Sequence, residues 1–202
     1  MKTLSARDIS SSLVTGFTTG IIGWRILLFL GHPLPFNLPP GLLVPLVPVL
    51  WLAGVKLGYI LGAVFRPFVQ FGRFAAIGFA NAAVDFGVLY AFIAATGDAS
   101  GGAYTAFKAV SFSVATVHSY LWNKYWAFDA AGSRGGQREI AAFLSVAVTS
   151  LLVNVGAASA VVALRPETFA VASWAGIGAV VGSAAALIFS FTGFRLFVFK
   201  RR

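Results

Sequence analysis

Long apolar stretches fill most of this chain and constrain its fold more than any other feature. At about 1.5 Å of rise per helical residue, each stretch can cross a hydrocarbon layer of roughly 30 Å. Only 10% of the 202 residues are charged, whereas a soluble domain usually carries about 25%. The sequence therefore predicts an all-α, polytopic membrane protein of about six transmembrane helices. The expected segments are Leu13–Leu30, Leu42–Phe65, Phe68–Ala95, Tyr104–Phe128, Glu139–Leu164 and Phe169–Phe199.

Composition also narrows the classes of function. The net charge of +9 would suggest nucleic-acid binding in a soluble protein. Here the basic residues lie mainly between apolar stretches, so we expect contact with membrane lipids and no nucleic-acid partner. The chain has no cysteine, and it contains no D-x-D motif, glycine-rich phosphate loop or histidine cluster. We therefore expect a protein that is not an enzyme and needs no metal or other cofactor.

The distribution of lysine and arginine predicts the orientation. Basic residues gather before the first segment, in the second and fourth connections, and at the end of the last segment. The alternate connections hold only Arg165. Because cytosolic connections are enriched in basic residues, both termini are expected in the cytosol, in a cell (inner or plasma) membrane. The basic residues that support this orientation are Lys2, Arg7, Arg66, Arg73, Lys124, Arg134, Arg138, Arg195, Lys200, Arg201 and Arg202.

Glycines recur at four-residue spacing in the first two segments. The first segment contains Gly16 and Gly20, and the second contains Gly54, Gly58 and Gly62. This spacing places small residues on one helix face and allows a second helix to approach closely. The pattern favours packing within one bundle, and a seam between two copies in a homo-oligomer is the alternative.

The last four segments contain an internal repeat with an offset of about seventy residues. In the first alignment Asp85 falls on Asn154, and in the second a basic residue and two aromatic residues match. Each repeat spans a helix pair, so both repeats have the same orientation in the membrane. The sequence thus predicts two parallel helix-pair repeats. The aligned stretches are residues 74–86 with 143–155, and residues 119–128 with 190–199.

Polar residues inside these segments predict a cleft. Asp85 lies twelve residues after Arg73, about 18 Å deep in a helix. Charged groups in a membrane need a partner or an aqueous cavity, and Lys108 is within reach of Asp85. The cleft is either a path for a sugar headgroup or a polar network that holds helices together. Its expected residues are Asn81, Asp85, Lys108, His118, Asn123 and Asn154.

Four basic residues at the expected cytosolic rim could hold a phosphate. Arginine offers a bidentate fork to phosphate oxygens, and several donors together hold such a group well. The alternative is that these residues only set the topology. The candidate phosphate or lipid-headgroup residues are Arg73, Lys124, Arg195 and Arg66.

Three motifs resemble the GtrA-like family of small membrane proteins. They are Arg73-Phe74-x-x-x-Gly78-x-x-Asn81-x-x-x-Asp85-Phe86, Asn123-Lys124-x-Trp126-x-Phe128 and Phe194-Arg195-x-Phe197-x-Phe199. The resemblance covers residues 68–202 and implies a four-helix transmembrane domain. Residues 1–67 are then an N-terminal extension with two transmembrane helices. The third motif departs from the family pattern, because Phe194 stands where asparagine is frequent.

The resemblance implies a role with polyprenyl-phosphate-linked sugars. The first expectation is translocation of such a monosaccharide carrier across the membrane for the synthesis or modification of cell-surface polysaccharide. The second is an accessory protein that anchors or stabilises a membrane glycosyltransferase. A third expectation rests on the single buried acid, Asp85, and is a small proton-coupled exporter.

Overall fold

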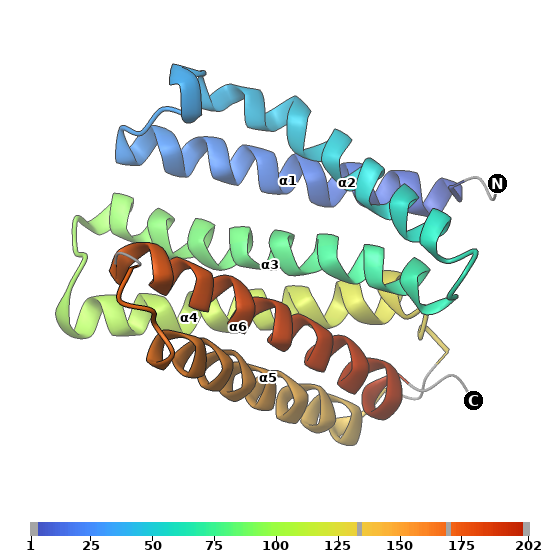
Figure 1. Ribbon diagram of the computed structural model, residues 1–202. Coiled ribbons are helices and arrows are strands. Elements are labelled where there is room, and N and C mark those ends of the chain that lie inside the picture. Colours follow the sequence, from blue (N-terminus) through green and yellow to red (C-terminus); the bar gives the residue numbers. More distant parts are fainter. Residues whose placement is uncertain (1–3, 133–134, 169–170, 200–202) are drawn as a thin grey trace. The chain divides into compact units, whose positions relative to one another are not determined.

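The computed structural model describes residues 4–132, 135–168 and 171–199, and all regular elements in these residues are helices (Figure 1). This confirms the predicted all-α class. The chain forms two compact units, Met1–Asp129 and Ala130–Arg202, and each is described by itself. The family-based division at residues 67 and 68 stays a prediction.

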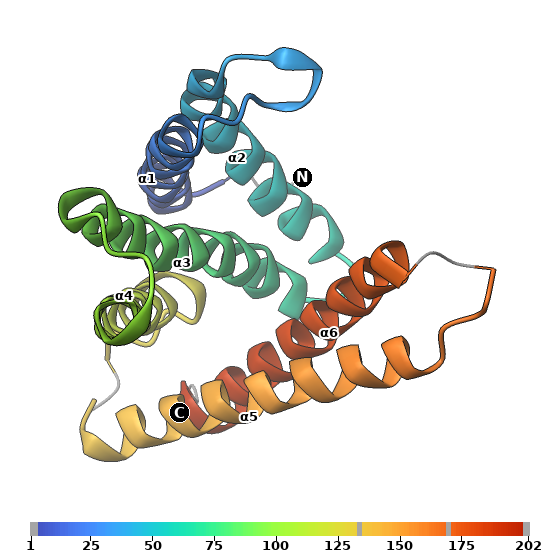
Figure 2. The same ribbon diagram turned by 90° about the vertical axis from the view of Figure 1, so that its left-hand side faces the viewer.

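The first unit contains four long helices. Helix α3 contacts α1, α2 and α4, and it therefore lies between the N-terminal helix pair and α4 (Figures 1 and 2). The elements are α1 (Ala6–Leu30), two short 3₁₀ turns η1 (Pro35–Asn37) and η2 (Pro40–Leu42), α2 (Leu43–Leu61), α3 (Pro67–Thr96) and α4 (Gly101–Trp122), followed directly by a π-helical turn, η3 (Asn123–Ala127). The second unit contains α5 (Gln137–Ala163), α6 (Val171–Gly193) and a second π-helical turn, η4 (Phe194–Val198).

Six long helices match the six predicted segments, and five of them are long and apolar enough to cross a membrane. The exception is α4, which has 22 residues but carries Lys108, His118 and several hydroxyl side chains. Three of these side chains, Lys108, Ser111 and His118, contact polar side chains of α3, as described below. Of the residues used to predict the orientation, Lys2, Arg134, Lys200, Arg201 and Arg202 lie outside the described residues, as does Phe169.

Helix α1 begins seven residues before the predicted segment. The Ser5 hydroxyl accepts a hydrogen bond from the backbone N–H of Asp8 at 3.1 Å, so Ser5 caps the helix. Such a cap satisfies one of the backbone donors that a helix start leaves unpaired. The prediction from apolar character alone was wrong here because the first two turns of α1 are polar.

Glycines set the packing of α1 on α2. A Cβ atom on Gly16 would lie 2.5 Å from the Cα of Pro48, and one on Gly20 would lie 2.4 Å from the carbonyl oxygen of Leu43. Neither position can hold a larger residue without moving α2. Gly58 makes a similar approach to the Phe68 carbonyl of α3, at 2.8 Å. The interpretation of the glycine spacing as packing within one chain is confirmed for these positions.

The two predicted repeats share local structure. Both end in a π-helical turn, closed by the Phe128 N–H to the Asn123 carbonyl at 3.0 Å and by the Phe199 N–H to the Phe194 carbonyl at 2.7 Å. In the first repeat, the rings of Phe74 and Phe128 lie 6.1 Å apart. The matching rings of Phe143 and Phe199 lie 6.4 Å apart. Equivalent contacts at equivalent positions confirm the repeat.

Candidate functional site

A cluster of hydrogen bonds surrounds Asp8 at the start of α1. Asp8 Oδ2 accepts from the Tyr59 hydroxyl at 2.7 Å and from Arg73 Nη2 at 3.0 Å, and Asp8 Oδ1 accepts from Trp126 Nε1 at 3.0 Å. Arg73 Nε lies 2.7 Å from Asp8 Oδ1 and completes an ion pair. The Ser5 hydroxyl also donates to Oδ2, at 2.7 Å. We call these five residues the Asp8 cluster.

The Asp8 cluster joins all four helices of the first unit. Asp8 belongs to α1, Tyr59 to α2, Arg73 to α3, and Trp126 to the turn that ends α4. The Asp8 side chain is 1% exposed and that of Arg73 is 17% exposed. A charge so buried is stable only with a partner of opposite sign and further hydrogen bonds. The N-terminal helix pair therefore supplies the groups that neutralise and orient Arg73.

The π-helical turn η3 places a second basic residue at the same end of the unit. Lys124 Nζ lies 3.2 Å from the Tyr120 hydroxyl and 5.5 Å from the centre of the Tyr120 ring. Asn123 is buried, and its amide donates to the Ser119 carbonyl at 2.8 Å. The Asn123 Oδ1 atom has no hydrogen-bond partner in the described part of the chain. The turn thus holds Lys124 among aromatic rings and leaves a buried acceptor beside it.

Polar side chains continue from this end along the contact between α3 and α4. The first pair is Asn81 and His118, whose Oδ1 and Nδ1 atoms are 3.4 Å apart. Deeper, Lys108 Nζ forms an ion pair with Asp85 Oδ2, and the Ser111 hydroxyl donates to Asp85 Oδ1 at 2.7 Å. We call these five residues the polar stripe. The structure thus brings together the predicted pair, Asp85 with Lys108, and also places His118 beside Asn81, two residues expected in the same cleft.

The polar stripe lies at increasing depth. Along α3, Asn81 follows Arg73 by eight residues, about 12 Å, and Asp85 follows by twelve, about 18 Å. Asp85 and Lys108 are partly exposed, at 19% and 39% of their side chains. An ion pair at such depth is costly against lipid, so it favours contact with water or a polar ligand. The stripe has the layout of a polar path that begins at the Asp8 cluster.

The other predicted site residues lie elsewhere. Arg66 precedes α3 and is exposed. Asn123 bonds within its own helix end. Asn154 and Arg195 belong to the second unit. Asn154 there contacts α6, where a Cβ on Gly182 would lie 2.6 Å from the Asn154 carbonyl oxygen. Phosphate binding by the basic residues, and a place for Asn154 in the cleft, stay predictions.

Three residues of the Asp8 cluster and the polar stripe were not predicted from the sequence: Asp8, Tyr59 and Ser111. Asp8 carried a signal, because Ser5-x-x-Asp8 has the spacing of a helix-capping motif that places an acid in the first turn. Ser111 is three residues after Lys108 and so shares its helix face. Tyr59 carried no local signal, since its role depends on how α2 meets α1 and α3.

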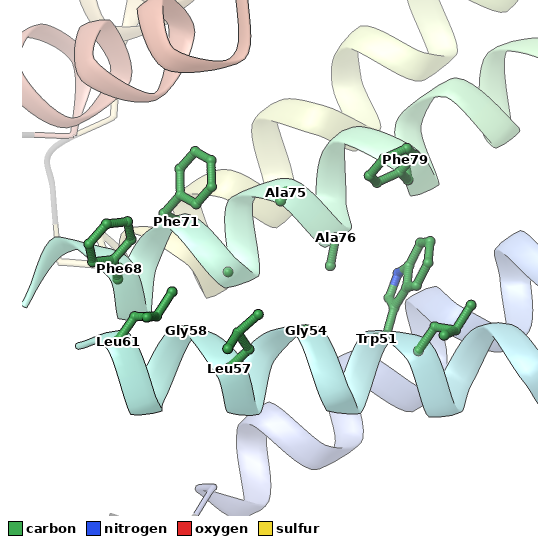
Figure 3. Close-up of a pocket in the computed structure, with 12 residues that line it drawn as sticks. Trp51, Gly54, Leu57, Gly58, Leu61, Phe68, Phe71, Ala75, Ala76 and Phe79 are labelled. Atoms are coloured by element: carbon green, nitrogen blue, oxygen red, sulfur yellow. The ribbon is translucent and has the colours of Figure 1, made fainter. Parts of the chain in front are cut away.

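An apolar groove of about 300 Å³ lies between α2 and α3 (Figure 3). It extends from Leu61 and Phe68, beside the connection between the two helices, to Trp51 and Phe79, roughly 15 Å away along α2. Its floor is formed where Gly58 and Gly72 bring the helices close. The lining side chains are apolar except for the indole N–H of Trp51, so the groove suits hydrocarbon and offers little to a sugar.

The described residues contain no group of three histidine, cysteine, aspartate or glutamate side chains that could hold a metal ion. The side chains of the Asp8 cluster and the polar stripe offer hydrogen bonding and charge pairing. Such groups can bind anions and hydroxyls.

Comparisons with known proteins relate this chain to a family of membrane proteins. Over 79 aligned residues, the chain is 30% identical to YngA, an uncharacterised membrane protein of Bacillus subtilis (strain 168). The alignment covers 39% of this chain and 49% of that protein. The chain thus spans about half the length of this curated relative. No solved structure matches. The family model described as GtrA/DPMS, transmembrane domain, matches residues 73–200, which include Arg73, the polar stripe and both π-helical turns. The chain is a multi-pass membrane protein that belongs to the GtrA/DPMS transmembrane domain family.

Proposed function

We propose that this protein moves a polyprenyl-phosphate-linked monosaccharide from the cytosolic to the outer leaflet, for cell-surface polysaccharide synthesis or modification. The observation that carries the proposal is the polar stripe. It lies on a helix pair inside the domain that matches the GtrA/DPMS family, a family associated with polyprenyl-phosphate sugars. It begins beside two basic residues and reaches an intramembrane ion pair.

The three parts of such a lipid have matching surroundings. The phosphate needs cationic donors, and Arg73 and Lys124 lie at the end of the unit where the stripe begins. The sugar hydroxyls need donors and acceptors at several depths, and the amide, imidazole, carboxylate, ammonium and hydroxyl groups of the stripe provide both. The prenyl tail stays in hydrocarbon, against the exposed apolar faces of the helices.

Leaflet transfer in proteoliposomes tests this proposal. The purified protein is reconstituted alone with a radiolabelled short-chain prenyl-phosphate glucose, and the fraction of sugar accessible outside is followed with time. We expect transfer faster than in protein-free vesicles and slower with Asn81→Ala. Asn37→Ala serves as a control, because Asn37 lies in the connection between α1 and α2.

A well-folded protein that transfers no lipid would contradict the proposal and favour the accessory role. In that case a membrane glycosyltransferase should co-purify with the tagged chain, and deletion of the chain should reduce the enzyme's product.

A further inference from the structure

The Asp8 cluster has the donor arrangement of an anion-binding site. Tyr59, Arg73 and Trp126 come from three different helical elements, and all three point a hydrogen-bond donor at the same carboxylate. Arg73 donates a hydrogen bond to Asp8 Oδ2 from Nη2 at 3.0 Å, and its Nε lies 2.7 Å from Oδ1 in an ion pair. A charged donor of this kind recognises carboxylates and phosphates alike.

We propose that Asp8 is an internal substitute for the lipid phosphate: it fills an anion site formed by Arg73, Tyr59 and Trp126, and the phosphate displaces it when substrate binds. This inference rests on the proposed function. It adds Tyr59 and Trp126 to the headgroup site and gives the N-terminal helix pair a role in binding. The ligand class is a phosphate ester, whose oxygens accept hydrogen bonds as the carboxylate oxygens do.

Asp8 is placed where it can leave. It is the third residue of α1 and follows the cap, Ser5, so its release opens only the first helical turn. Terminal turns open at a small fraction of the free energy of global unfolding. The one other ion pair that the described residues show near this turn joins Arg7 to Asp129, and both side chains are about half exposed. Exposed pairs of this kind hold weakly.

The three donors cannot follow Asp8 out of the site. Tyr59 lies near the end of α2, one residue after Gly58, which packs against the α3 backbone. Trp126 is 2% exposed and lies within the π-helical turn. Arg73 is on the face of α3 that meets α1 and α2. Once the carboxylate leaves, the site keeps its geometry and a positive charge, which suits an incoming anion.

The test measures binding of farnesyl phosphate to the full chain in nanodiscs of zwitterionic phosphatidylcholine. Asp8→Asn keeps the size of the side chain and removes its charge. We expect it to bind farnesyl phosphate tighter by roughly tenfold or more, because a site that is seldom free binds with an affinity reduced by its free fraction. Arg73→Gln should abolish binding in either background. Asp98→Asn, in the exposed connection after α3, is the matched control and should bind as the unmodified chain does.

A second readout uses the unmodified protein, so it does not depend on the stability of a variant. The indole ¹⁵N–H resonance of Trp126, assigned with Trp126→Phe, should shift when farnesyl phosphate is added and stay unchanged with farnesol. Farnesol has the same tail without the phosphate. Inorganic phosphate at the same concentration should not displace the lipid; if it does, the site belongs to free phosphate and the lipid assignment is overturned.

The outcomes separate this inference from the proposed function. If farnesyl phosphate binds through Arg73 but Asp8→Asn binds no tighter and the Trp126 resonance does not move, Asp8 is a structural partner and this inference is wrong. Translocation would then still stand. If no variant binds farnesyl phosphate while all remain folded, the headgroup site of the proposed function is wrong as well.

Discussion

The two helix pairs, α3–α4 and α5–α6, share a framework but differ in what they carry. Both end in a π-helical turn, and both pack a phenylalanine near the start of the first helix against one that follows the turn. In the described residues of the second pair, however, no ion pair occupies the positions that match the polar stripe. In the first alignment Asp85 is matched by Asn154 and Asn81 by Ser150. When the second alignment is extended towards the start of α4, Lys108 falls on Ala179, Ser111 on Gly182 and His118 on Phe189.

This difference separates what the fold requires from what it permits. The aromatic contacts and the turns recur because each pair must close its end by packing. The ion pair does not recur, so it is not needed to hold two such helices together. At the matching place α6 approaches α5 closely at Gly182 instead. This is the difference that the proposed sugar path along the stripe leads us to expect.

The largest effect is expected at the Asp8 cluster, which the second pair lacks. Arg73→Gln should destabilise the protein by about 3 kcal/mol or more, because it leaves the buried Asp8 carboxylate without its cation. The double variant with Asp8→Asn should recover most of this loss, since neither charge remains. Thermal denaturation in detergent of the two single variants and the double variant measures the coupling. Additive losses would contradict a direct ion pair.

Exchanging the residues at the matched positions should cost somewhat less. Asn154→Asp places a carboxylate beside α6, a helix without any charged residue, and should destabilise by about 2–3 kcal/mol. Asp85→Asn should cost only about 1–2 kcal/mol, because the Lys108 that it leaves unpaired is 39% exposed. The same denaturation experiment compares them. An equal or smaller cost for Asn154→Asp would show that the second pair offers a partner for an acid.

The close contact in the second pair should tolerate no added methyl group. A Cβ on Gly182 would lie 2.6 Å from the Asn154 carbonyl oxygen, so Gly182→Ala should destabilise by about 1–2 kcal/mol. Gly156 on α5 has nothing within 4 Å of such a Cβ, and Gly156→Ala should be neutral or stabilise the helix slightly. Equal effects of the two variants on thermal stability would contradict the described contact.

The smallest effect is expected in the shared framework. Phe74→Leu and Phe143→Leu each remove the contact of that ring with the phenylalanine after the turn, and each should destabilise the protein by about 1 kcal/mol. The loss at Phe143 should be the larger of the two, because its ring also stacks on Phe194 at 4.6 Å. Denaturation of both variants checks this. A large loss at one position and none at the other would mean that the repeats do not share a framework.

Much of the fold could be predicted because lipid imposes simple rules. Apolar length gave the helices, and glycine spacing gave the close contacts of α1 with α2. The start of α1 was predicted too late, because a search for apolar segments does not detect a polar first turn. Here the Ser5 cap and the ion pair of Asp8 with Arg73 stabilise that turn. The repeat was visible because its aromatic residues recur at a fixed offset.

The site was harder to predict because its contacts join distant residues. Asp85 with Lys108 could be anticipated, since both charges lie deep in neighbouring segments and each needs a partner. Arg73 was expected to be available to a ligand, and its partner was missed. Asp8 lies 65 residues away, and no periodicity in the sequence brings α1 to α3. The partner of a buried charge depends on tertiary packing.

The measurement that tests the account most directly converts the first helix pair into the second and follows lipid transfer. Asp85→Asn with Lys108→Ala removes both charges together and introduces the residues found at the matched positions, so no ion is left unpaired. Asn154→Ala is the control in the second pair. In proteoliposomes loaded with short-chain prenyl-phosphate glucose, we expect the double variant to fall to the rate of protein-free vesicles and the control to keep its activity. An unchanged rate in the folded double variant would contradict a sugar path along α3 and α4.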